Sequence, residues 1–113
     1  MVSISHDGKT TSVPGTYRVL LLFTPDGHFG ANEPINYHGG SYRVTPGGFT
    51  TGGMYSTLVS YVGDDPVVLL SVSAIQAFRN EVPALATVSG STLTITVGGY
   101  TLMARRHGRQ ANL

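Results

Sequence analysis

The side chains that could do chemistry in this sequence are mainly tyrosines and histidines, because only 12% of the residues are charged. An imidazole exchanges a proton near neutral pH, and a phenol can orient a ligand by a hydrogen bond while its ring contacts an apolar surface. On these grounds Tyr42 and His38 are the catalytic candidates. The candidates for ligand contacts are Phe23, His28, Glu33, Tyr37, Phe49, Met54, Tyr55 and Tyr61.

Three of these candidates, Glu33, Tyr37 and His38, fall in segment 32–40, which contains a proline and ends in two glycines. This composition predicts a loop, and binding and catalytic residues concentrate in loops. These three are therefore the strongest site candidates.

Structural roles compete with function for the remaining candidates. His28 follows a predicted turn, where a side chain is ordinarily exposed to solvent. Tyr42 and Tyr55 suit the core or the rim of a sheet as well as they suit a site.

Several other chemistries lack their sequence signatures. The chain has no cysteine, and its four histidines form no closely spaced pair, so no metal site is predicted. It has neither the serine elbow of a hydrolase nor the glycine-lysine motif of a phosphate-binding loop, so no cofactor is predicted. The net charge of +1 gives no reason to expect a nucleic acid partner.

These side chains must be positioned by short strands, because glycine-rich turns separate segments of β-favouring residues. Strands are predicted at 16–24 and 28–31, joined by a Pro-Asp-Gly turn, and at 41–45, and one or two more within 49–62. The clearest signal is a hairpin in which 92–97 and 100–106 flank a Gly-Gly pair.

Segment 65–82 predicts one short helix, since Asp65 can cap the first turn and Pro66 suits the first helical position. Its residues 74–82 carry the firmer helical signal. The alternative is a strand over 66–73, because that part is rich in valine and leucine.

The resulting fold class is mainly β: a small antiparallel β-barrel with one short helix around 65–82. Four Gly-Gly pairs would let the sheet bend toward closure. We expect an N-terminal arm at 1–13, a single barrel domain at 14–106 and a C-terminal tail at 107–113. The N-terminus lacks the apolar region of a signal peptide and no segment is long enough to span a bilayer, so the expected location is cytoplasmic.

Two family resemblances support a small barrel. The sequence resembles the META-domain family at 30–32 (Gly-Ala-Asn), 40–44 (Gly-Ser-Tyr-Arg-Val), 49–50 (Phe-Thr) and 56–57 (Ser-Thr), although that family usually has cysteine where this chain has Ala31. Its turn at 22–28 (Leu-Phe-Thr-Pro-Asp-Gly-His) is similar to one in bacterial lipocalin-like domains. Neither resemblance implies one defined activity.

The expected function is the binding of a small, largely apolar molecule inside the barrel. One alternative is a cofactor-independent cyclase or isomerase acting on a polyketide-like or terpenoid substrate. Another, implied by the META resemblance, is a stress or envelope-associated protein. An exposed strand edge would let two copies pair, so a homodimer is the protein partner that the sequence suggests.

Overall fold

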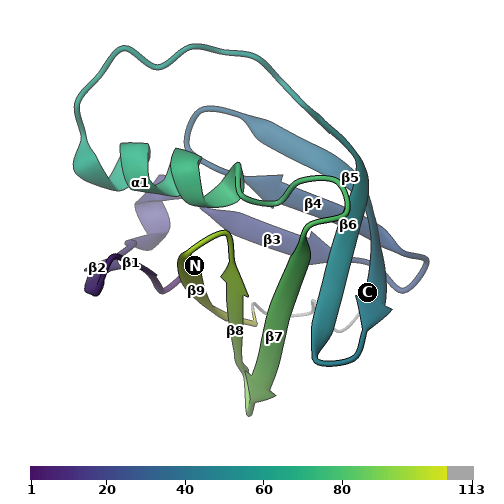
Figure 1. The fold of residues 1–113 in the computed structure, drawn as a ribbon. Coiled ribbons are helices and arrows are strands. Elements are labelled where there is room, and N and C mark those ends of the chain that lie inside the picture. Colours follow the sequence, from purple (N-terminus) through teal and green to yellow (C-terminus); the bar gives the residue numbers. More distant parts are fainter. Residues whose placement is uncertain (107–113) are drawn as a thin grey trace.

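The computed structural model describes residues 1–106, which form one antiparallel sheet of nine strands and a single α-helix (Figure 1). This arrangement confirms the predicted mainly β class. The strands are β1 (Ser3–His6), β2 (Lys9–Ser12), β3 (Leu20–Phe23), β4 (His28–Asn32), β5 (Tyr37–Thr45), β6 (Gly48–Ser56), β7 (Pro83–Ser89), β8 (Thr92–Val97) and β9 (Tyr100–Arg105), and the helix α1 is Pro66–Ile75.

The sheet curls strongly but remains a half-barrel, with β2 and β3 as its two edges (Figure 1). Its strand order is β2-β1-β9-β8-β7-β6-β5-β4-β3, so each neighbouring pair is antiparallel and most pairs are consecutive hairpins. Curling brings β3 opposite β8 and β9 without a ladder between them (Figure 1). The space between β3 and these two strands is therefore where the barrel is open.

The segment expected as an N-terminal arm is instead part of the sheet. Asp7 and Gly8 have φ values of 51° and 76°, which suit the two central positions of a tight hairpin turn. This turn joins β1 to β2, and β1 also pairs with β9. Ile4 is consequently buried in the core with no exposed surface.

The Gly98-Gly99 hairpin forms as predicted, because both glycines adopt positive φ, 55° and 85°. The prediction of a strand at 41–45 is also correct, although β5 begins earlier, at Tyr37. The predicted strand at 16–24 is shortened, because Gly15–Tyr17 form a 3₁₀ turn and Arg18 is left-handed. Strand β7 was not predicted.

The helix begins as predicted but ends at Ile75, so the half expected to be firmer is mostly not helical. The physical reason is a competing interaction with β6. The Thr51 hydroxyl donates a hydrogen bond to the Arg79 carbonyl, and the Glu81 amide donates to the Thr51 carbonyl. These bonds hold the chain after α1 alongside β6, where a helix could not continue.

The core fills the end of the half-barrel that α1 covers. Ile4, Ile75, Ile95 and Leu102 are fully buried there, and the Phe29, Phe49 and Phe78 rings pack together nearby. The turn that follows α1 reaches the β8–β9 turn, since a Cβ on Gly98 would lie 2.9 Å from the Ala77 methyl group. The opposite end, near the β7–β8 turn, has no such cover from residues 1–106 (Figure 1). No helix among those residues has the length and apolar character needed to cross a bilayer.

Candidate functional site

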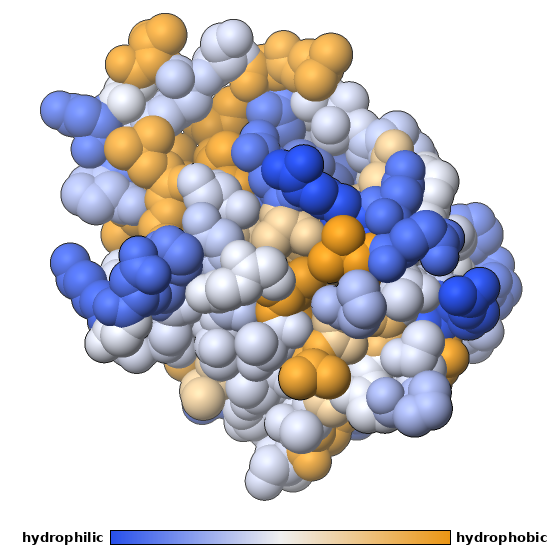
Figure 2. Space-filling model, in the orientation of Figure 1, coloured by the Kyte–Doolittle hydropathy of each residue, from blue (hydrophilic) through white to orange (hydrophobic). Residues whose placement is uncertain are grey.

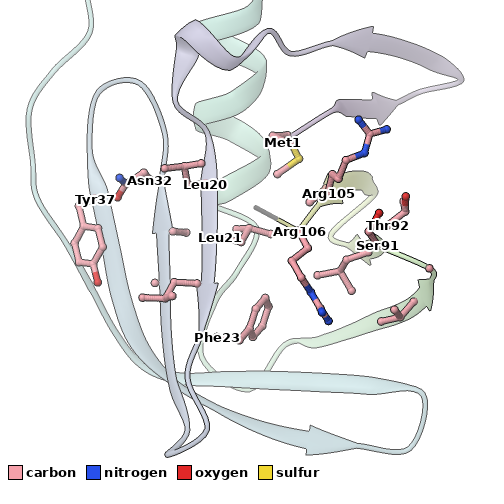
Figure 3. A pocket seen from close by; sticks show the side chains of 17 residues that line it. Met1, Leu20, Leu21, Phe23, Asn32, Tyr37, Ser91, Thr92, Arg105 and Arg106 are labelled. Atoms are coloured by element: carbon pink, nitrogen blue, oxygen red, sulfur yellow. The ribbon is translucent and has the colours of Figure 1, made fainter. Parts of the chain in front are cut away.

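A groove of about 950 Å³ lies at the open side of the half-barrel, between β3 and the β8–β9 pair (Figure 3). It is lined mainly by aliphatic and small side chains, with one phenylalanine and one tyrosine. The lining residues are Met1, Leu20, Leu21, Leu22, Phe23, Gly30, Ala31, Asn32, Tyr37, Val88, Gly90, Ser91, Thr92, Leu93, Ala104, Arg105 and Arg106.

The inner part of the groove is formed by alternate residues of facing strands. Leu21 and Phe23 point inward from β3, and the Figure 3 view shows them directed toward Arg106. On the other wall, Leu93 of β8 lies opposite Ala104 of β9 in the sheet register. Since Ala104 is small, the wall at this level does not reach β3, and space remains between the two sides.

The outer part of the groove extends around the edge of β3. Leu20 and Leu22 occupy the other face of that strand and are each 39% exposed. Tyr37 lies on the same side (Figure 3), and its hydroxyl would be 3.0 Å from a Cβ on Gly30, so glycine leaves room for it. Burial, followed by the neighbouring Tyr55, raises the pKa of Tyr37.

The edge of β3 exposes backbone groups as well as side chains. The Thr24 amide donates to the His28 carbonyl at 3.0 Å, and bonded and non-bonded positions alternate along an antiparallel pair. Leu22 is therefore bonded to β4, whereas the N–H and C=O groups of Leu21 and Phe23 face the groove. At the other end of β3, the Val19 carbonyl accepts a hydrogen bond from the Met1 amino group at 3.1 Å, which closes the gap there.

Two of the predicted ligand contacts, Phe23 and Tyr37, line this groove, and the remaining predicted site residues do not. They also do not come together elsewhere as one site. Phe49 is a core residue that packs against Phe23. The Met54 amide donates to Asn80, and the Tyr61 hydroxyl accepts from the Asp65 amide.

Glu33 and His38 form a buried pair rather than part of the groove. Glu33 Oε2 lies 3.0 Å from His38 Nε2, and the Glu33 side chain has no exposed surface. Its other oxygen accepts hydrogen bonds from the amides of Ile35 and Asn36 at 3.0 and 2.8 Å. This carboxylate therefore organises the turn between β4 and β5, which is only four residues long rather than the predicted nine-residue loop.

Tyr42 and His28 also have partners within the fold. The Tyr42 hydroxyl donates to the Thr24 carbonyl at 2.7 Å, and its ring packs edge-on against Phe23. His28 Nδ1 lies 3.1 Å from Asp26 on an exposed turn. The Thr24 hydroxyl, followed by His28, lowers the pKa of Asp26. Tyr55 is largely exposed and packs beside Tyr37.

The residues that sequence reasoning missed are those of the second wall, above all Leu93, Ala104 and Arg106. A signal for them was present, because inward residues alternate along β9 from the buried Leu102 to Ala104, and Arg106, directly after the strand, continues this alternation. The predicted hairpin at 92–97 and 100–106 implies that alternation, but it does not show that the opening of the half-barrel lies opposite these strands.

The surface around the opening mixes apolar and polar side chains. The view in Figure 2 shows hydrophilic and hydrophobic groups side by side in the middle of the face toward the viewer, and further hydrophobic groups over the crossover between β6 and α1. Residues 1–106 contain no cluster of three or more histidine, aspartate or glutamate side chains placed to hold a metal ion. The groove therefore offers apolar contact, a few hydrogen-bonding groups and positive charge.

Comparisons with known proteins identify the fold and nothing finer. No family model matches the chain, and no curated protein matches it. Its structure is similar to the NMR structure of a protein from Burkholderia xenovorans, with a TM-score of 0.65 and 18% sequence identity over 93% of this chain and 77% of the other. At that identity the likeness concerns architecture, so the META and lipocalin-like resemblances remain predictions.

Proposed function

We propose that this half-barrel binds a small, largely apolar molecule in the groove between β3 and the β8–β9 pair. The observation that carries the proposal is the groove itself, whose volume of about 950 Å³ falls within the range of small-molecule sites. Its lining of leucines, Phe23 and small residues, with few hydrogen-bonding groups, is also typical of such sites.

The distribution of side-chain sizes inside the half-barrel supports this proposal. Large residues such as Ile95 and Leu102 fill the end that α1 covers. At the next inward level, toward the opening, Leu93 on β8 is paired with the small Ala104 on β9. The Ala104 methyl group leaves a space that neither wall fills, and apolar walls favour an apolar occupant.

The cyclase or isomerase alternative remains a prediction from sequence. Tyr42 and His38, its proposed catalytic residues, do not line the groove, and the hydrogen bonds of both side chains are directed to groups of the fold. Among residues 1–106, the contacts of Tyr42 and His38 do not favour catalysis over binding.

Ala104→Trp tests the proposal by filling the groove. The indole would extend from β9 into the space opposite Leu21, so we expect affinity for a neutral apolar probe such as Nile red to fall by roughly tenfold or more. The matched control is Met103→Trp, because Met103 is the adjacent residue on the opposite face of the same strand. The measurement is probe fluorescence as a function of protein concentration.

The two variants also report on their own folding, since the natural chain contains no tryptophan. The fluorescence of the introduced tryptophan shows whether each variant is folded. In Ala104→Trp, the probe should quench this fluorescence only to the extent that it still binds in the groove. Equal probe affinity in the natural protein and in both folded variants would place the probe outside the groove and overturn the proposal.

A further inference from the structure

An arginine lies at the entrance of the groove on the inner face of the sheet. Arg106 continues the inward alternation of Leu102 and Ala104, and its amide donates a hydrogen bond to the Ser91 carbonyl at 2.9 Å. Its backbone is thereby fixed at the end of the β8–β9 ladder. Figure 3 shows the guanidinium reaching into the space faced by Leu21 and Phe23.

This positive charge has no internal counterpart in the described part of the chain. The six acidic residues are Asp7, Asp26, Glu33, Asp64, Asp65 and Glu81, and none of them lines the groove. Within residues 1–106, the arginine that forms an ion pair is Arg43, with Glu81 at 3.9 Å. The Arg106 guanidinium makes no hydrogen bond or ion pair with those residues.

Two arginines, Arg105 and Arg106, line this apolar groove, which makes it complementary to an amphipathic anion. The planar guanidinium presents parallel N–H donors that match the two oxygens of a carboxylate. A hydrocarbon chain would contact Leu21, Phe23 and Leu93, while its carboxylate stayed at the opening within reach of water. A single-chain molecule can follow this groove around one strand, because its lining includes residues on both faces of β3.

We infer that the ligand of this groove is a single-chain carboxylate, and that Arg106 binds its carboxylate group. This inference rests on the proposed function and names its ligand class. Arg79 provides a comparison with the same charge, because it is exposed in the segment after α1 and does not line the groove.

The test compares decanoate with decanol, each below its micelle-forming concentration, at pH 7.5, where the carboxylic acid is ionised. Binding is measured by calorimetry and located from amide and methyl NMR shifts of β3, β8 and β9. We expect decanoate to bind more tightly than decanol by roughly tenfold, the factor that a charge-assisted hydrogen bond supplies. Arg106→Gln should remove that preference without weakening decanol, whereas Arg79→Gln should retain it.

Each outcome separates this inference from the proposed function. Equal affinities for decanoate and decanol, or a preference that survives Arg106→Gln, would overturn the inference while leaving apolar binding intact. A preference lost in Arg79→Gln instead would also overturn it, because that arginine lies outside the groove. If neither molecule shifts the β3, β8 and β9 signals, the proposed function itself is wrong.

Discussion

At the scale of single residues, Asp65 links two parts of the chain that are far apart in sequence. One carboxylate oxygen accepts hydrogen bonds from the amides of Val67 and Val68, which caps α1. The other accepts from the Tyr17 hydroxyl at 2.7 Å. The Tyr17 hydroxyl, followed by the two amides, lowers the pKa of Asp65, and the same contact raises the pKa of Tyr17.

This lowered pKa has a defined effect on stability. Because the folded protein favours the ionised form of Asp65, the contribution is present above the ordinary pKa of 3.8 and is lost as pH falls through the lowered folded-state pKa. Asp65→Ala should therefore reduce the melting temperature by a few degrees at pH 6, and the difference from the natural protein should shrink below pH 3.8. Thermal unfolding followed by circular dichroism across this pH range measures both.

Asp65→Asn serves as the control for charge, because an amide oxygen can still accept the bond from Val67. It should lose less stability than Asp65→Ala at pH 6. A difference that remained constant from pH 6 to pH 3 would show that the ionised carboxylate is not the source.

At the scale of elements, the crossover between β6 and α1 depends on one asparagine. Residues 57–65 have no regular structure and include Leu58 and Val62, which are 92% and 97% exposed. The Asn36 side chain accepts from the Thr57 hydroxyl at 2.7 Å and the Val59 amide at 2.8 Å, and donates to the Val59 carbonyl at 2.9 Å. With few buried side chains, this segment is held mainly by such polar contacts.

Asn36→Ala should release the start of the crossover. We expect a loss of about 1–2 kcal/mol in the free energy of unfolding, since several hydrogen bonds to partly exposed groups are removed. The Val59 amide should also exchange with solvent much faster, which NMR hydrogen exchange measures directly. Ser60→Ala is the matched control, because Ser60 is exposed in the same segment and its side chain has no hydrogen-bond partner among residues 1–106. Unchanged Val59 exchange in Asn36→Ala would contradict this account.

Local sequence rules predicted the elements whose determinants are local. The Gly98-Gly99 hairpin and the Asp65 cap follow from residue types at fixed positions, and both form as predicted. The Asp7-Gly8 turn has the same kind of local signal, although the polar composition of segment 1–13 predicts an arm. The end of α1 was not predictable in this way, because Thr51, distant in sequence, binds the chain that follows it.

The candidate site was predicted less well than the fold, for a related reason. Phe23 and Tyr37 were named because of their residue types, and both line the groove. Ala104 matters because it is small and faces β3, which depends on how far the whole sheet curls. Glu33 and His38 drew attention as ionisable neighbours, but a buried carboxylate that binds amides and an imidazole also serves a structural turn.

At the scale of the whole molecule, the half-barrel has two unequal edges. Strand β2 is polar and includes Lys9, a residue type that discourages pairing with other chains. Strand β3 contains three leucines and a phenylalanine, with free backbone groups at Leu21 and Phe23. Strand β3 is short, but its apolar side chains and unpaired backbone groups are those of an edge that can pair with another strand.

Hydrogen exchange at β3 should reveal this open edge directly. In dilute protein, the amides of Leu21 and Phe23 should exchange at least ~10-fold faster than that of Leu22, which is bonded to β4. The central Ile95 amide gives the protected reference. Protection of Leu21 and Phe23 that increases with concentration would indicate the homodimer suggested by the sequence. Equal protection of all three at every concentration would contradict an open half-barrel.

The wrapping of the groove around β3 has a practical consequence for handling the protein. A ligand bound there would cover the exposed apolar residues at the edge of β3. By mass action it would also shift the folding equilibrium toward the folded state as its concentration rises. Preparations without such a ligand should precipitate sooner on storage than preparations to which it has been added. The ligand would thus protect the protein that binds it from aggregation.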